Sequence, residues 1–188
     1  MKKTILFPIV IVLTLFGSCT STKKKIVLSQ PYPSQINWPK DYTPEEAGFF
    51  VHNEIDVKAT PEKVWNILLA AETWPEWYEG ATNVNITSSN DGILKEDSVF
   101  QWKTMGLNFE STIQEFEPYS RLSWVSIKKS IKGYHAWLII PTQDGCKLVT
   151  EESQHGFLTF LEKTFQPKKL EKLHQLWLEK IKEKAEAI

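Results

Sequence analysis

Neither sign of charge is in excess in this chain of 188 residues: 22 lysines and arginines face 23 aspartates and glutamates, a formal net charge of −1. Such a balance argues against a nucleic-acid-binding surface, which normally needs a basic patch. Phosphate-binding loops and dinucleotide glycine fingerprints are absent. The four histidines show no HxxxH spacing, and the two cysteines no CxxC spacing. We therefore predict no nucleic-acid partner, no nucleotide cofactor and no metal.

A long apolar run is also missing. The most apolar stretch, Ile5 to Phe16, follows Lys2 and Lys3 and is shorter than the about 20 residues that a membrane helix needs. The letters "LFGSC" that follow resemble a bacterial lipobox. The resemblance implies cleavage before Cys19 and a lipid on its sulfur, so residues 1–18 would be a lipoprotein signal peptide. An ordinary signal peptide with a chance cysteine is the alternative.

Cysteine is scarce, and only Cys146 accompanies Cys19. If Cys19 is acylated, Cys146 has no partner for an internal disulfide. Four prolines and a lysine cluster between residues 20 and 48 predict a flexible tether. Residues 19–48 would then join a lipid anchor to a single domain at 49–188. We expect an exported monomer that is anchored to a bacterial membrane, on its periplasmic or outer side.

The domain begins with a strand-like segment at 49–57. Thr60 then suits a helix N-cap, and Pro61 takes the favoured first helical position. A second short helical piece is predicted at 74–79, because Pro75 limits the first helix. After residue 81, turn residues recur at short intervals, which is typical of an antiparallel meander.

Symmetric pairing about each turn defines one aromatic face of this meander. It places Trp102 opposite Phe109, and Ile113 opposite Trp124. Around Asp144-Gly145 it places Trp137 opposite Glu152, with His135 opposite Gln154. Because side chains alternate with period two, one face collects the following apolar residues: Phe100, Trp102, Phe109, Ile113, Leu122, Trp124, Trp137 and Ile139.

A long amphipathic helix is predicted after Pro167. Five positions recur at a spacing of three or four residues, with lysines and glutamates between them: Leu170, Leu173, Trp177, Ile181 and Lys184. This stripe needs an apolar partner, and the aromatic face of the sheet can supply one. The sequence therefore predicts an α+β helix-grip fold. A six- to seven-stranded antiparallel sheet wraps around a long C-terminal helix, with two short helices after the first strand.

Three segments carry a family resemblance: "IDVKATPEKVWNILLAAETWPEWYEGA" at 55–81, "FESTIQEFEPYSRLSW" at 109–124 and "YHAWLIIPTQDGCKLVTEESQHG" at 134–156. They resemble the START-like superfamily, also called SRPBCC or Bet v 1-like, and its polyketide cyclase/dehydrase branch most of all. The resemblance implies a cavity for a hydrophobic small molecule between sheet and helix. Some members of this superfamily are cyclases or dehydratases, and others carry lipids or hormones.

His135 and Glu152 are the candidate catalytic residues, because both are predicted to point toward the inner face. Such a pair could form an acid/base couple. It could equally line a binding pocket or satisfy itself as a buried structural pair, and no third catalytic group or nucleophile is evident nearby.

The function predicted here is the binding of an apolar small molecule or lipid by a membrane-anchored protein. The alternatives are a cyclase/dehydratase-like enzyme that uses His135 and Glu152, and an envelope interaction protein with a vestigial pocket. The predicted ligand-binding residues share the inner face of the fold: Phe100, Trp102, Phe109, Ser111, Ile113, Trp124, His135, Trp137, Ile139, Thr150, Glu152 and Trp177.

Overall fold

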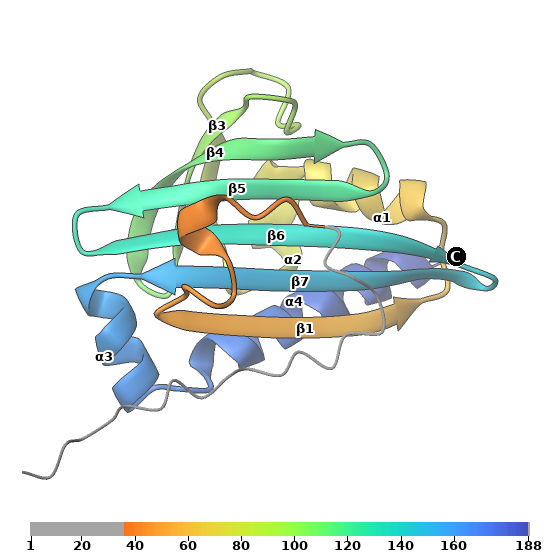
Figure 1. The fold of residues 1–188 in the computed structure, drawn as a ribbon. Helices are drawn as coiled ribbons and strands as arrows, with labels where there is room; N and C mark the ends of the chain where they lie inside the picture. The colour runs from red at the N-terminus through yellow and green to blue at the C-terminus, as the bar shows by residue number, and fades with distance from the viewer. Residues whose placement is uncertain (1–35, 188) are drawn as a thin grey trace, which may run out of the picture.

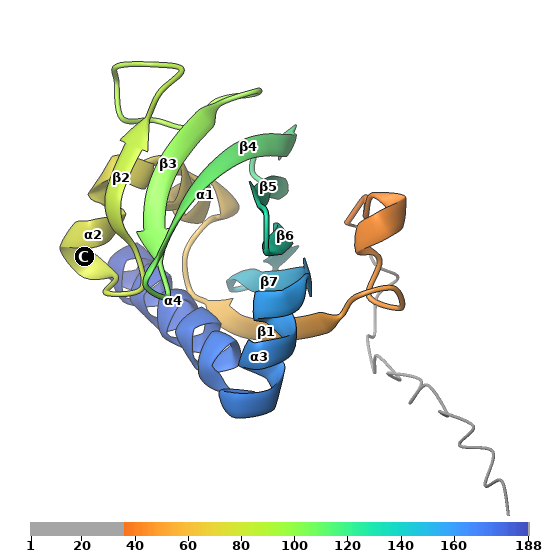
Figure 2. The ribbon, with the colours of Figure 1, turned by 90° about the vertical axis from the view of Figure 1, so that its left-hand side faces the viewer.

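The computed structural model describes residues 36–187. The predicted signal peptide, Cys19 and residues 19–35 of the predicted tether lie outside the described residues. Within these bounds the chain forms one antiparallel sheet of seven strands in the order β1-β7-β6-β5-β4-β3-β2. The sheet curves around a C-terminal helix, as Figure 1 and Figure 2 show. The α+β helix-grip prediction is confirmed.

The first strand, β1 (Phe49–Val57), leads into α1 (Pro61–Leu69). The Thr60 hydroxyl accepts a hydrogen bond from the Lys63 backbone N–H, so the predicted N-cap is confirmed. A 3₁₀ turn, η2 (Ala71–Thr73), and the short helix α2 (Trp74–Trp77) follow. Together these elements close one end of the space enclosed by the sheet.

The meander consists of β2 (Thr82–Ile86), β3 (Val99–Thr104), β4 (Leu107–Glu117), β5 (Arg121–Lys128), β6 (Ile131–Thr142) and β7 (Gly145–His155). The predicted pairs of β3 with β4 and of β4 with β5 are confirmed. The β6–β7 pairing is shifted by two residues: His135 pairs with Glu152, and Trp137 with Thr150. Thr142 pairs with Gly145, so the turn is centred on Gln143-Asp144, one residue earlier than the predicted Asp144-Gly145. Because the shift is an even number, every side chain keeps its predicted face.

Two helices complete the domain, α3 (Phe157–Phe165) and α4 (Lys169–Glu186). The α4 face that meets the sheet buries Leu170, Trp177 and Ile181. Lys184 does not belong to this stripe: it is exposed, and Ala185 is buried in its place, because the helical period favours the next position. No helix among the described residues is long and apolar enough to cross a membrane.

Residues 36–48, which the sequence places in the flexible tether, instead pack on the outer face of the sheet. They include the 3₁₀ turn η1 (Lys40–Tyr42). Ile36 is buried against Tyr134, and the rings of Trp38 and Tyr42 lie 5.4 and 5.7 Å from that of Tyr134. This second, smaller core explains why the outer face of β6 is apolar.

Candidate functional site

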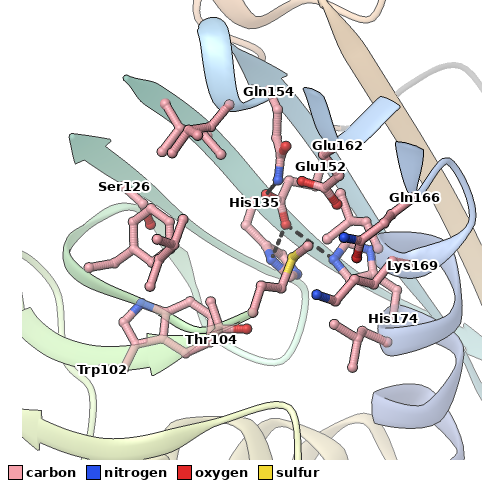
Figure 3. Close-up of a pocket in the computed structure, with 18 of the residues that line it drawn as sticks. Trp102, Thr104, Ser126, His135, Glu152, Gln154, Glu162, Gln166, Lys169 and His174 are labelled. Carbon is pink, nitrogen blue, oxygen red and sulfur yellow. Dashed lines mark hydrogen bonds and ion pairs between the residues drawn. The ribbon is translucent and has the colours of Figure 1, made fainter. Parts of the chain in front are cut away.

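A cavity of about 290 Å³ lies between the inner face of the sheet and helices α3 and α4 (Figure 3). Its walls are mainly apolar and aromatic, with contributions from Trp102, Trp124 and Trp177. The lining residues that are exposed to solvent are Phe165 and its neighbours Gln166 and Lys169. The cavity therefore opens at the junction of α3 and α4.

The polar end of the cavity is organised around the Glu152 carboxylate. Its Oε2 atom lies 3.1 Å from His135 Nδ1 and 3.1 Å from His174 Nε2. Gln154 Nε2 donates to the other oxygen, Oε1, at 2.6 Å. Figure 3 shows β6, β7 and α4 bringing these side chains together. A buried carboxylate that accepts three hydrogen bonds is well compensated for its loss of water.

The protonation states follow from this arrangement. Burial lowers the pKa of His135 to about 4, although its hydrogen bond to Glu152 opposes the shift. Burial alone would raise the pKa of Glu152, but the hydrogen bonds from His135 and His174 outweigh it and hold that pKa well below its usual range. At neutral pH the site therefore contains a charged Glu152 beside a neutral His135.

The two histidines differ in what remains free for a ligand. A neutral His135 donates from Nδ1 to Glu152, so its Nε2 accepts from the Thr150 hydroxyl at 2.8 Å. Both ring nitrogens of His135 are thus engaged within the protein. His174 also donates to Glu152, but its buried Nδ1 atom has no hydrogen-bond partner within residues 36–187. His174 therefore keeps one ring nitrogen that no described residue engages.

A second carboxyl group, Glu162 of α3, lines the same cavity. Burial and the nearby charge of Glu152 raise the pKa of Glu162 to about 7, while Lys169 opposes the shift. The Oε1 atom of Glu162 is buried and has no hydrogen-bond partner in the described part of the chain. Such a carboxyl can give or take a proton near neutral pH, which is how general acids and bases are tuned.

His135, Glu152 and His174 could also hold a metal ion, since their ligand atoms all lie within 4.8 Å of one another. Two imidazoles and a carboxylate suit zinc or iron. However, both ring nitrogens concerned are hydrogen-bonded to Glu152, so an ion would have to replace both bonds. No spacing in the sequence signals this group, because its members come from β6, β7 and α4.

Comparison with known proteins places this arrangement in a family. Residues 49–186 match the family model described as polyketide cyclase / dehydrase and lipid transport. The chain belongs to this polyketide cyclase/dehydrase and lipid transport family. None of the curated proteins matches it significantly.

Several solved structures share this fold. A hypothetical protein from Helicobacter pylori is 27% identical, with a TM-score of 0.77 over 83% of this chain and 99% of the other. StfQ, a di-domain ARO/CYC protein of the steffimycin biosynthetic pathway, is 14% identical, with a TM-score of 0.61 over 73% of this chain and 50% of the other. A START superfamily protein from Mycobacterium smegmatis is 16% identical, with a TM-score of 0.58 over 72% and 99%. The last two likenesses concern the fold alone.

The residues predicted to bind ligand divide into two groups in this family member. Six line the cavity: Trp102, Phe109, Trp124, His135, Glu152 and Trp177. The other six are not among the lining residues and are buried in the packed inner side of the sheet: Phe100, Ser111, Ile113, Trp137, Ile139 and Thr150. The two groups share a face, but only the first lies where α4 leaves room.

Several cavity residues were missed from sequence. They come from the β3–β4 turn, from the end of α2 and from α3 and α4, and include Tyr78, Met105, Leu161, Glu162 and His174. For His174 a signal was present, because it lies four residues after Leu170 and three before Trp177, on the predicted apolar stripe.

Proposed function

We propose that this protein binds a small, mostly apolar molecule that carries a hydrogen-bond acceptor, in the cavity between its sheet and α4. The supporting observation is the combination of aromatic walls with one polar end. Ligand sites in proteins typically combine such apolar walls with a few placed polar groups.

Two indoles of the cavity wall support an acceptor on the ligand. The Nε1 atoms of Trp124 and Trp177 are buried, and no described residue accepts a hydrogen bond from them. By contrast, Trp102 donates to Ser111 Oγ at 2.9 Å. An unpaired buried donor is costly. A carbonyl, ether or hydroxyl oxygen of a ligand would satisfy it, while the rest of the ligand packs on the rings.

We further propose that the ligand is a lipid or a lipid-like metabolite and that the protein works as a membrane-anchored lipoprotein through Cys19. The apolar cavity and the family's lipid transport members support the first part. The lipobox-like sequence supports the second. Native mass spectrometry of the protein extracted from its own membrane tests both, because an acyl modification and a bound lipid each add a defined mass.

The Leu161→Trp substitution is expected to fill the cavity and to weaken binding of the fluorescent probe anilinonaphthalene sulfonate at least about tenfold. Leu161 lines the cavity from α3 and is half-buried, so the larger ring can be directed inward. Fluorescence titration measures the change. Ile93→Trp is the matched control, since Ile93 lies on the surface away from the cavity and should leave the affinity unchanged. Equal affinities in both variants would contradict the proposal.

A second candidate function is cyclase- or dehydratase-like acid–base chemistry, and the convergence of His174 and Glu162 on one cavity favours it. His135 and Glu152 also reach the cavity, as this hypothesis requires. With both nitrogens of His135 engaged, His174 Nδ1 is better suited as the base. In a dehydration it would take the proton beside a carbonyl, while protonated Glu162 gives its proton to the departing hydroxyl, which leaves as water.

The Glu162→Gln substitution is expected to slow this conversion about 100-fold or more, since an amide cannot donate the proton of an acid. The assay follows loss of water from lipid and metabolite extracts by mass spectrometry. Activity of the unchanged protein should fall as the pH rises through about 7, where Glu162 loses its proton. A conversion that persists in Glu162→Gln with the same pH profile would exclude Glu162 as the acid.

A further inference from the structure

The outer surface of α3 is unusually apolar for an exposed helix. The side chains of Phe157, Phe160 and Phe165 are 66%, 61% and 74% exposed. Ile127, at the end of β5 just before the β5–β6 turn, is 58% exposed. Scattered single apolar residues need no explanation, but a group of large ones on neighbouring elements marks an interaction surface.

The first residues of α3 hold this helix next to the β5–β6 turn. The backbone N–H of Leu158 donates to Ser130 O at 3.1 Å. Gly156, with φ of 117°, lets the chain approach Ser130 closely, where a Cβ atom would lie 2.5 Å from the Ser130 carbonyl oxygen. Figure 1 shows α3 at the same end of the sheet as the β5–β6 turn. The aromatic surface and the turn therefore form one face, which we term the mouth face (residues 127–132 and 156–169).

Positive charge surrounds the apolar groups of the mouth face. Its two segments contain one glutamate, Glu162, and six lysines: Lys128, Lys129, Lys132, Lys163, Lys168 and Lys169. Among the described residues none of these lysines forms an ion pair with a carboxylate. Lysines elsewhere do so, for example Lys95 with Asp91 and Lys147 with Glu54. The unbalanced charge is thus local, although the whole chain is nearly neutral.

The mouth face also surrounds the opening of the cavity. Phe165 and Lys169 belong to both, and Leu158 and Leu161 line the cavity from the inner side of the same helix. Figure 2 views the molecule from this end, with α3 in front of α4. A surface that contacts the mouth face would therefore cover the route into the cavity.

We propose that the mouth face docks on an anionic lipid bilayer, with its phenylalanines in the headgroup–acyl boundary and its lysines at the lipid phosphates. Helices that lie in a membrane interface combine aromatic residues with flanking lysines in this way. Each lysine near an anionic surface adds electrostatic attraction. The docking surface stands independently of the proposed ligand. Exchange of that ligand with the bilayer through the cavity opening rests on the proposed function.

Vesicle co-sedimentation tests the docking surface. The chain beginning at residue 20 is suitable, because residues 36–187 contain the complete sheet, its helices and its core. It is expected to bind vesicles of phosphatidylcholine with phosphatidylglycerol at least about tenfold more tightly than vesicles of phosphatidylcholine alone. Phe157→Ser/Phe160→Ser and, separately, Lys129→Glu/Lys168→Glu should each weaken the binding to anionic vesicles about tenfold or more.

Matched controls lie at the opposite end of the molecule. Tyr119→Ser removes a 47% exposed ring, and Lys58→Glu/Lys63→Glu makes the same charge change, so both should bind within about twofold of the unchanged chain. None of the variant positions lines the cavity, so anilinonaphthalene sulfonate binding should persist in all of them. If the unchanged chain does not bind the probe, that result counts against the proposed function and leaves the docking proposal untouched.

Equal binding to neutral and anionic vesicles, or no vesicle binding, would overturn the docking proposal. So would a dimer in sedimentation velocity that becomes a monomer in Phe157→Ser/Phe160→Ser. That result would assign the face to a second copy of the chain.

Discussion

The Trp177→Ala substitution is expected to lower the free energy of unfolding by about 3–5 kcal/mol, measured by urea denaturation. Trp177 is 1% exposed, and its ring lies 4.4 Å from Tyr78, 5.0 Å from Trp74 and 5.1 Å from Trp137, centroid to centroid. Removing it leaves a void that these rigid rings cannot refill, so the lost contacts add to the lost burial.

Trp77→Ala is the control for this prediction. Trp77 is a half-buried tryptophan on α2 that stacks with Lys184 at the surface, and its loss should cost about 1 kcal/mol. Trp177→Ala should also widen the cavity, because the indole forms part of its wall. If Trp177→Ala lowers the free energy of unfolding no more than Trp77→Ala does, α4 can move inward and close the void.

Most of the fold was predictable, because its determinants are periodic. Alternation along β3 to β7 assigned residues such as Trp102, Trp124 and Trp137 to one face, and this survived a two-residue error in the β6–β7 register. An even shift preserves the face, whereas an odd one would have exchanged the faces of that strand. The helical period likewise placed Trp177 toward the sheet. Such patterns report which side of an element is buried.

The candidate site was only half predictable. The sequence pattern shows which face of a strand or helix is buried, but a cavity depends on how far apart two facing elements lie. Thr150 and Trp102 share the inner face, yet only Trp102 lines the cavity. His174 was missed because a polar histidine within a row of apolar helix positions does not by itself indicate a functional residue. Its partner, Glu152, is 22 residues away on another element. The packing of residues 36–48 was missed for a related reason: prolines indicate irregular backbone, and irregular backbone can still be buried.

The Glu152→Ala substitution is expected to cost about 3–5 kcal/mol of unfolding free energy, close to that of losing Trp177. The carboxylate accepts hydrogen bonds from His135, His174 and Gln154, and its side chain is only 14% exposed. Without it, three donors remain at the polar end of the cavity with no acceptor in the protein, and each keeps its desolvation cost. Urea denaturation at neutral pH measures the loss.

Glu183→Ala is the exposed counterpart, because Glu183 also pairs with a basic residue, Lys180, but is 71% exposed. Its loss should lower the free energy of unfolding far less than Glu152→Ala does, because solvent screens the exposed pair. In a double-mutant cycle, Glu152→Ala should cost markedly less when His174→Ala is already present, since one stranded donor has been removed. Strict additivity would show that water fills the site and satisfies the donors. The polar end of the cavity would then be an open, hydrated surface for the ligand and not a preformed anchor.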